Sequence, residues 1–367
     1  MSEFVQLHVL VSYPPSNLNR DDLGRPKTAV MGGAQRLRVS SQSLKRAWRT
    51  SDIFASTLAG HLGVRTKEMG TLVYRSLTSG VSLAEILRGA NDAPATFQPV
   101  TEEKGRKWAS EIAGIFGKLK SGENALEIEQ LAHFSPEEIA AIDALILKLA
   151  ASGKDPDEDD RKLLMKRHTA ADIAMFGRML AASPIYNTEA AVQVSHAVTV
   201  HPVAVEDDYF TAVDDLNRGD EGMGAGHLGE TEFASGLFYL YVCVNRDLLR
   251  ENLGGDEALT GAALRALVEA AAKVAPTGKQ NSFASRAYAS YLLAEKGCQQ
   301  PRSLSVAYLK PLQDADLLGS AINALKDTRN KMDAVYGNCS DSWCDMNAHA
   351  GEGALQEVLD FVAGHHA

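Results

Sequence analysis

Hydrophobic and polar side chains alternate along residues 4–11, which is typical of a β-strand. One face of this strand is apolar and is formed by Val5, Leu7, Val9 and Val11. The opposite face carries Phe4, Gln6 and His8. Because successive side chains of a strand point to opposite sides of a sheet, we predict one face buried in a core and one face open to a ligand.

A second strand is predicted after a long loop. Residues 12–33 are rich in Pro, Asn, Asp and Gly, and loops of more than about 15 residues usually carry function. In the sequence QRLRVS that follows, apolar residues alternate with Arg36 and Arg38, which we expect on an exposed sheet face. Ser40 and Ser41 are good capping residues and begin a predicted helix.

Residues 55–170 are predicted to form a mostly helical insertion. Its clearest helix is SPEEIAAIDALILKLAAS, in which Ser135 is the cap, Pro136 occupies the first turn and Glu138 completes a capping box. We interpret the acidic run 155–160 that follows as a solvated turn.

Strand patterns return after the insertion, at 171–179, at 191–200 and most clearly at 236–244. Further elements are predicted towards the C-terminus: a helix at 259–275, a strand at 287–294, and helices at 311–334 and 352–363. This order predicts an α+β fold with a large insertion. A split β-α-β arrangement of the ferredoxin or RRM type fits it, and the open sheet face of that fold is a common RNA platform.

An aromatic pair, Tyr209 and Phe210, lies in the polar and Gly-rich segment 201–233. Two roles are open for this pair: packing the segment against the body of the protein, or projecting from it as a wedge or stacking platform. The pattern alone favours packing.

The composition predicts a soluble, cytoplasmic protein. The 367 residues are 45% hydrophobic and 23% charged, and no apolar run approaches the roughly 20 residues that cross a bilayer. The N-terminus lacks the basic start of a secretory signal. We therefore expect no membrane partner.

Charge is distributed unevenly along the chain. The formal net charge is −10, yet residues 1–50 hold eight basic and three acidic side chains, a local balance of +5, so the remainder carries −15. This asymmetry indicates one anion-binding face on an acidic body.

Signatures of the common enzyme classes are missing from the sequence: it has no GxxxxGK[ST], HExxH or GxSxG motif, and no GxGxxG that follows a predicted strand. His8, His196 and His201 are candidates for metal-free RNA cleavage, but histidines in strands are more often structural. Cys339 and Cys344, near His349, lack the second pair that a zinc site usually has, so we expect no metal and no cofactor.

A phosphate site is the chemistry that remains. The helix start at Ser40, Ser41, Gln42 and Ser43 presents backbone N–H groups and hydroxyls to an anion. Positive charge in the next turns comes from Lys45, Arg46 and Arg49.

The order of several motifs carries a resemblance to a known family. The run LHVLVSYPPSNLNRDDLGRPKTAVMGGAQRLRVSSQSLKRAWR at 7–49 is followed by FGRM at 176–179, SHAVTVH at 195–201, YFTAVDDL at 209–216 and HLGETEFASGLFY at 227–239. This series resembles the CasC family, the guide-RNA-binding backbone subunits of type I-E CRISPR Cascade. The Cys-containing C-terminal region departs from the family pattern, and we assign no contact there.

The resemblance implies an RRM-like palm with a helical finger insertion and a thumb hairpin. The implied parts are 1–54 as the first part of the palm, 55–170 as the finger, 171–200 as palm strands, 201–232 as the thumb, and 233–367 as the rest of the palm with the C-terminal helices. The residues implied to hold guide phosphates are Arg20, Lys27, Ser40, Gln42, Lys45, Arg46 and Arg49. Such contacts cannot read sequence and so suit variable guides.

The resemblance also reverses the preference for packing of the aromatic pair and favours the role of a wedge. The reason is that the family's thumb displaces a base of the guide at regular intervals. Tyr209 and Phe210 match the thumb, Met179 matches a residue that helps to wedge bases apart, and Lys279 is a further candidate for RNA contact. The implied partners are the CRISPR guide RNA, further copies of the chain, target DNA paired with the guide, and the other Cascade subunits CasA, CasB, CasD and CasE. No catalysis is implied.

Two other functions compete with this one. The first is a backbone subunit of a type III effector, which would cleave target RNA through a loop aspartate, Asp21 or Asp22. The second is a free-standing RNA-binding module that forms no multimer. Metal-dependent cutting of complementary RNA at regular steps distinguishes the first, and binding as a monomer distinguishes the second.

Overall fold

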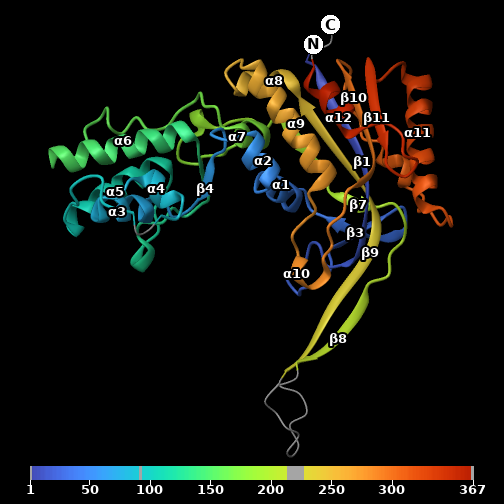
Figure 1. Cartoon of the computed structure of the whole chain (residues 1–367), viewed down its shortest axis with the longest axis horizontal. Coiled ribbons are helices and arrows are strands. Elements are labelled where there is room, and N and C mark those ends of the chain that lie inside the picture. The colour runs from blue at the N-terminus through green and yellow to red at the C-terminus, as the bar shows by residue number, and fades with distance from the viewer. Residues whose placement is uncertain (1, 91–92, 213–226, 365–367) are drawn as a thin grey trace, which may run out of the picture. The chain divides into compact units, whose positions relative to one another are not determined.

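The structure, a computed structural model, describes residues 2–90, 93–212 and 227–364 (Figure 1). The chain divides into two compact units. One, the sheet unit, comprises Met1–Thr57, Val192–Asp247 and Gly261–Ala367. The other, the helical unit, comprises Leu58–Ala191 and Leu248–Thr260.

The sheet unit is built on one large antiparallel sheet with the strand order β11-β10-β1-β9-β7-β3-β2, to which β6 and β8 add by pairing with β9. Its strands are β1 (Phe4–Ser16), β2 (Thr28–Met31), β3 (Ala34–Val39), β6 (Val192–Val194), β7 (Ala197–Thr199), β8 (Glu206–Ala212), β9 (His227–Asn245), β10 (Ala289–Gly297) and β11 (Ser342–Asn347). Its helices are α1 (Ser41–Arg49), α2 (Asp52–Thr57), α10 (Gln280–Phe283), α11 (Leu317–Tyr336) and α12 (Leu355–Ala363), with a 3₁₀ turn at Ser305–Tyr308. The predicted combination of helices and strands is confirmed, and the strands form one large antiparallel sheet.

Both faces of β1 are covered, so the prediction of an open face on this strand is wrong. Every residue from Val5 to Val11 is buried, including Gln6 and His8. The physical reason lies far along the chain. Leu10 belongs to a core cluster that also contains Tyr291 of β10 and Leu325 of α11, so this helix covers the face that sequence pattern left open.

A buried polar network accounts for His8. Its Nε2 lies 3.1 Å from Glu295 Oε2, and its Nδ1 lies 2.9 Å from the Tyr239 hydroxyl. Burial lowers the pKa of His8, which keeps the ring neutral. Because a carboxylate only accepts, Nε2 carries the proton and the Tyr239 hydroxyl donates to Nδ1. Arg302 and Arg329 also donate to Glu295, at 2.6 and 2.7 Å, so the histidine belongs to a closed structural cluster.

The expected exposed arginine row on β3 is wrong for Arg36. This side chain is fully buried and donates to the carbonyl oxygens of Thr199, at 2.7 Å, and Tyr308, at 3.0 Å. Arg36 thus ties β3 to two distant segments, whereas Arg38 remains partly exposed.

A long two-stranded hairpin leaves the sheet (Figure 1). β9 has 19 residues, which at about 3.3 Å per residue allows a span of about 60 Å. Its C-terminal part pairs with β1 inside the sheet, and its N-terminal part pairs only with β8, from Glu206 opposite Phe233 to Ala212 opposite His227. Residues 213–226 of the predicted thumb lie outside the described residues.

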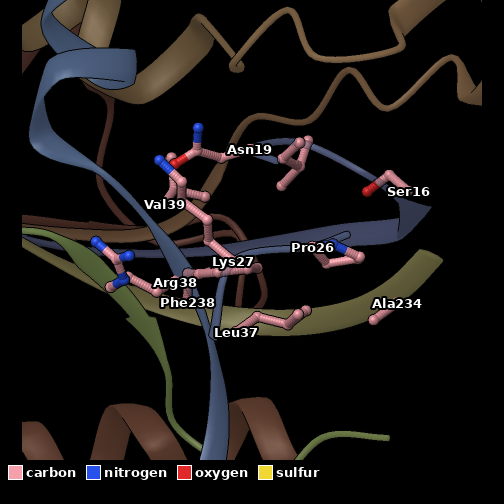
Figure 2. A pocket seen from close by; sticks show the side chains of 10 residues that line it. Ser16, Asn19, Pro26, Lys27, Leu37, Arg38, Val39, Ala234 and Phe238 are labelled. Atoms are coloured by element: carbon pink, nitrogen blue, oxygen red, sulfur yellow. The ribbon is translucent and has the colours of Figure 1, made fainter. Parts of the chain in front are cut away.

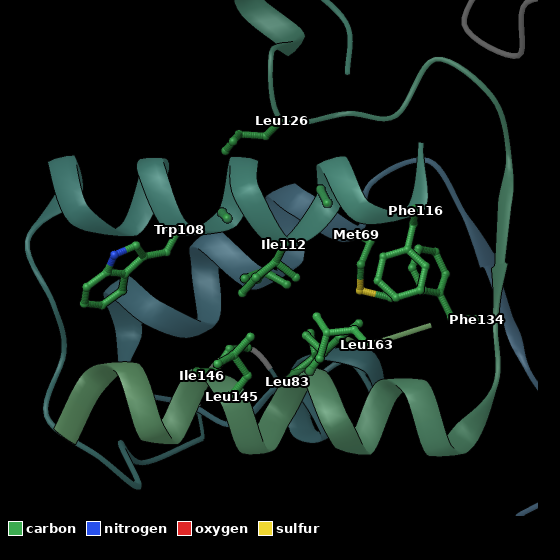
Figure 3. Packing of buried hydrophobic residues seen from close by; sticks show 14 of the residues in the cluster. Met69, Leu83, Trp108, Ile112, Phe116, Leu126, Phe134, Leu145, Ile146 and Leu163 are labelled. Atoms are coloured by element: carbon green, nitrogen blue, oxygen red, sulfur yellow. The ribbon is translucent and has the colours of Figure 1, made fainter. Parts of the chain in front are cut away.

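The helical unit has its own core, in which α5 and α6 face each other (Figure 3). Trp108, Ile112 and Phe116 of α5 pack with Leu145 and Ile146 of α6 in this core. The unit contains β4 (Val64–Thr66), α3 (Met69–Ser79), α4 (Leu83–Leu87), α5 (Glu102–Phe116), β5 (Ala132–Phe134), α6 (Pro136–Ser152) and α7 (Ala171–Phe176), with 3₁₀ turns at Gly122–Asn124 and Pro184–Tyr186. Helices α8 (Arg246–Asn252) and α9 (Glu257–Lys273) contribute to both units.

Sequence pattern was right for α6 and wrong for α7. The capping box of α6 is formed, with Ser135 accepting from the Glu138 N–H and Glu138 Oε2 accepting from the Ser135 N–H. The strand predicted at 171–179 is instead the helix α7 followed by a turn. Residues 171–175 are all buried, Asp172 included, so the segment lacks the exposed polar side by which an amphipathic helix is recognised. In the described part of the chain, no helix has both the length and the apolar character needed to span a membrane.

Candidate nucleic-acid interface

Helix α1 presents a basic surface beside a capped start. Leu44, Ala47 and Trp48 are buried and hold the helix on the sheet unit. Ser40 is the cap: its hydroxyl accepts from the Ser43 N–H at 3.3 Å, and the residue is only 7% exposed. Ser40 therefore shapes the helix start, while the N–H groups of the first turn have no partner within the helix.

The basic side chains of α1 differ in exposure. The helix contains no acidic residue. Gln42 and Arg46 are exposed, whereas Lys45 and Arg49 are partly buried. Burial lowers the pKa of Lys45, because the ammonium has lost part of its hydration.

The loop between β1 and β2 is fastened to the start of α1. Asn19 Oδ1 accepts from the Ser40 N–H at 2.9 Å, and the Asn19 carbonyl accepts from the Lys27 N–H at 2.8 Å. Arg20 is exposed and forms an isolated bridge with Pro26. These contacts fix the loop that carries two of the predicted cations, Arg20 and Lys27, to the start of α1.

A shallow hollow lies next to this loop, and its lining includes Lys27 and Arg38 (Figure 2). Arg38 Nη1 donates to Nδ1 of His196 at 2.8 Å. The pKa of His196 is lowered, first by burial and then by the charges of Arg38 and Lys27, so its ring nitrogen stays able to accept. The hollow therefore carries positive charge, from Lys27 and Arg38, on a lining that is otherwise largely apolar.

The base of the hairpin meets the same loop. Asn17 is buried, and its Nδ2 donates to the carbonyls of Gly24 and Glu232, both at 2.9 Å. Arg25 pairs with the Glu232 carboxylate at 3.1 Å. The Lys279 ammonium donates to the Thr231 hydroxyl, so this predicted RNA contact is anchored on β9.

The two aromatic residues of β8 have different surroundings. Phe210 is 44% exposed and stands opposite Gly229, where an added Cβ would come within 2.3 Å of the Phe210 ring. Phe210 therefore packs across the hairpin on a glycine. Tyr209 is 66% exposed and points to the opposite face, because neighbouring strand residues alternate.

Met179 belongs to the helical unit and lies on a turn that is fixed by hydrogen bonds of the neighbouring residues. The neighbouring Arg178 is buried, and its Nη1 donates to Glu138 Oε2 at 2.7 Å. The backbones of Arg178 and Thr188 exchange two hydrogen bonds of 3.0 Å, and the Leu180 N–H donates to a side chain at 2.7 Å. Met179 itself is 74% exposed, so an apolar side chain projects from a fixed position.

Most of the predicted site residues thus share the sheet unit. They are Arg20, Lys27, Ser40, Gln42, Lys45, Arg46, Arg49, Tyr209, Phe210 and Lys279. Met179 lies in the helical unit. Sequence reasoning missed Asn17 and Asn19, which fasten the loop, although the turn-forming run SNLNRDD was the available signal.

One carboxylate of the β1–β2 loop has structural partners. Asp21 Oδ1 accepts from the N–H groups of Leu23 and Arg25, each at 2.9 Å, and so closes a turn. Over the described ranges, no group of three or more His, Cys, Asp or Glu side chains is arranged to hold a metal ion.

Comparison with known proteins agrees with this architecture over almost the whole chain. A chain of a CRISPR RNA-guided surveillance complex, pre-nicking, is similar with a TM-score of 0.77 and 26% identity, covering 98% of this chain and 99% of that chain. A chain of another CRISPR RNA-guided surveillance complex shares the fold, with a TM-score of 0.58, 24% identity and 98% coverage of both chains. The fold is therefore that of a protein found in such complexes.

The family itself follows from the sequence match. Residues 5–360 match the family described as CT1975-like protein, and the chain belongs to this family of Cas proteins. Comparison with curated proteins gave no match.

Proposed function

We propose that this chain is a cytoplasmic, non-catalytic backbone subunit that binds the guide RNA in a type I-E Cascade complex, as CasC does. The observation that carries the proposal is helix α1, whose capped start is followed by Lys45, Arg46 and Arg49 with no acidic neighbour in the helix. Full-length likeness to a chain of an RNA-guided surveillance complex supports it. The guide, further copies of the chain, target DNA and the other Cascade subunits are the proposed partners.

An RRM-like palm is part of this proposal. The central strands follow the order β10-β1-β9-β7, all antiparallel, which is the order of a split β-α-β fold. We take the helical unit as the finger and the β8–β9 hairpin as the thumb. Because both faces of β1 are covered, we place the guide along α1 and the β1–β2 loop rather than on the sheet face.

The proposed contacts bind the guide without reading its sequence. Ammonium and guanidinium groups on α1 meet phosphates, which are identical at every position. Tyr209 and Met179 are exposed and uncharged, so they suit unstacking of bases rather than phosphate binding. Guide segments between such wedges would then pair with target DNA.

The type III alternative assigns cleavage to Asp21 or Asp22. The Asp21 carboxylate is already engaged by two backbone N–H groups, which favours a structural role for it. A cleavage assay with complementary RNA and Mg²⁺ tests this alternative, and cutting at regular steps that is lost in Asp22→Asn would replace our proposal.

The deciding experiment is co-expression of the chain with the other Cascade subunits and a CRISPR array. We expect a particle several times heavier than the 39.4 kDa subunit, containing repeat-flanked guide RNA. The matched control replaces Lys45, Arg46 and Arg49 by alanine, and this variant should assemble with less RNA. An RNA-free monomer from the unmodified chain, with all subunits present, would contradict the proposal.

A further inference from the structure

A cavity of about 520 Å³ opens near the C-terminus of α11, in the sheet unit. Its walls come from residues 299–302, from Met332 and from residues 336–339. This volume lies within the range of about 300 to 1,000 Å³ that small-molecule sites occupy. The cavity shares no lining residue with the basic face of α1 or with the hollow beside Lys27.

Three amide side chains line this cavity: Gln299, Gln300 and Asn338. Each amide carries one oxygen that accepts and one NH₂ that donates two hydrogen bonds. Such groups match the edge of an unpaired nucleobase, which also alternates donors and acceptors. Gly337 has φ of +83°, a conformation open to glycine, and it ends α11 and turns the chain into Asn338.

An aromatic ring and a thioether supply the apolar wall. Tyr336 lines the cavity although 81% of it is exposed, so its ring is accessible from solvent. Met332, one turn earlier on α11, lines the same space. Aromatic faces exposed in this way are the usual stacking platforms for single-stranded nucleic acid.

The charge of the cavity favours a neutral ring over a phosphate. Arg302 is the one cation among the lining residues. Its two terminal nitrogens donate to the two oxygens of Glu295, at 2.6 and 3.1 Å, and its side chain is 15% exposed. The guanidinium is thereby neutralised and fixed, and the cavity keeps amide and aromatic groups as its recognition elements.

We propose that this cavity binds an unpaired nucleobase of single-stranded RNA or DNA. Tyr336 stacks on the base, and Gln299, Gln300 and Asn338 contact its edge. The site goes beyond the proposed function, which uses phosphate contacts on α1. Its occupant is an unpaired strand of either RNA or DNA.

Photo-cross-linking of the full-length chain tests this proposal. The probes are single-stranded RNA containing 5-iodouridine and single-stranded DNA containing 5-iododeoxyuridine, with adducts mapped by mass spectrometry. We expect adducts on peptides holding 299–302 or 332–339. Tyr336→Ala should reduce them about fivefold or more, the lower end of the loss expected for a base–aromatic stack. Val335→Ala is the control, because this neighbour is 76% exposed and does not line the cavity.

Adducts with RNA, with DNA or with both support the site and show which of the two nucleic acids it binds. Absence of adducts in both segments, or equal loss in Tyr336→Ala and Val335→Ala, overturns it. Adducts on α1 report the proposed function separately, so loss of one set leaves the other interpretable. Thermal melting of Tyr336→Ala should match the unmodified chain, since the exposed ring contributes little to the core.

Discussion

Replacing Arg178 by methionine tests how much the buried ion pair beside Met179 stabilises the helical unit. Arg178 is 5% exposed. Its guanidinium makes four hydrogen bonds, one to the Glu138 carboxylate and three to backbone carbonyls. Methionine keeps an extended side chain but removes the charge and all four hydrogen bonds.

The expected loss follows from burial of the ion pair. The side chains of Arg178 and Glu138 are 1% and 0% exposed, with 2.7 Å between their charged atoms. Without Arg178 the Glu138 carboxylate stays buried with no opposite charge. Because removing one partner of a buried pair costs about 3–5 kcal/mol, the free energy of unfolding of the helical unit should fall by that amount.

Urea unfolding followed by circular dichroism at neutral pH measures this loss. Arg161→Met is the matched control, since Arg161 pairs with Glu111 at 3.1 Å on the surface of the same unit, with 50% and 27% exposed side chains. Exposed pairs of this kind contribute about 0–1 kcal/mol. The two arginine variants should therefore differ by at least about 2 kcal/mol.

A second substitution checks the cause. Adding Glu138→Gln to Arg178→Met removes the uncompensated charge, and glutamine still serves in a capping box, so part of the lost stability should return. Equal stability of Arg178→Met and Arg161→Met, or a further loss on adding Glu138→Gln, would refute the reasoning.

The remaining predictions concern RNA binding and pH. Lys45→Ala should lower the slope of log affinity against log salt by about 0.7, the contribution of one phosphate contact on a single strand, in binding titrations with sequence preference unchanged. Tyr209→Ala should weaken single-stranded RNA binding by about 1–3 kcal/mol while leaving the salt slope unchanged, because a stacking face is lost and no charge. Burial and the charge of Arg178 lower the pKa of His168 to about 4. Since this is below the ordinary value of 6.5, the unfolded state binds more protons between these values, and stability falls by up to about 3 kcal/mol as pH drops from 6.5 to 4. His168→Gln should flatten that profile in urea unfolding at a series of pH values.

Each of these has an outcome that contradicts it. A base-selective defect in Lys45→Ala would show that the residue reads sequence. Loss of salt slope in Tyr209→Ala would mean that the variant disturbs the cations of the hairpin base. For His168→Gln, a profile as steep as that of the unmodified chain would assign the acid sensitivity to other groups. Lys331→Ala on α11, whose ammonium pairs with Asp327, is the charge control for Lys45→Ala.

Local features of the fold were predictable and distant ones were not. The capping box of α6 depends on residues three apart, so sequence shows it directly. The buried network around His8 depends on Glu295 and Tyr239, which lie more than 200 positions away. The alternating pattern of β1 does not reveal these partners. Helix α7 was missed because 171–175 are all buried, and a short buried segment without an exposed polar side fits a strand equally well.

The candidate site divides in the same way. Lys45, Arg46 and Arg49 lie on one short helix, so their common surface follows from helical spacing. Arg36 follows the same alternating pattern as Arg38, yet its partners are carbonyl oxygens 163 and 272 positions away. Alternation placed the two arginines on one face, and only the tertiary structure shows that Arg36 is covered.

Coverage of the sheet decides where a nucleic acid can lie. In an RRM the open face of the sheet stacks bases, and the sequence suggested this use for the face that holds His8. Here that face carries the His8–Glu295–Arg302 network and α11, and opening it would expose a carboxylate that is 0% exposed and held by two arginines. Removing such a network costs several kcal/mol, more than one stacked base returns. A single strand therefore binds more favourably where the sheet face does not have to open. Such positions are the cations and exposed rings of α1, of the β1–β2 loop and of the β8–β9 hairpin.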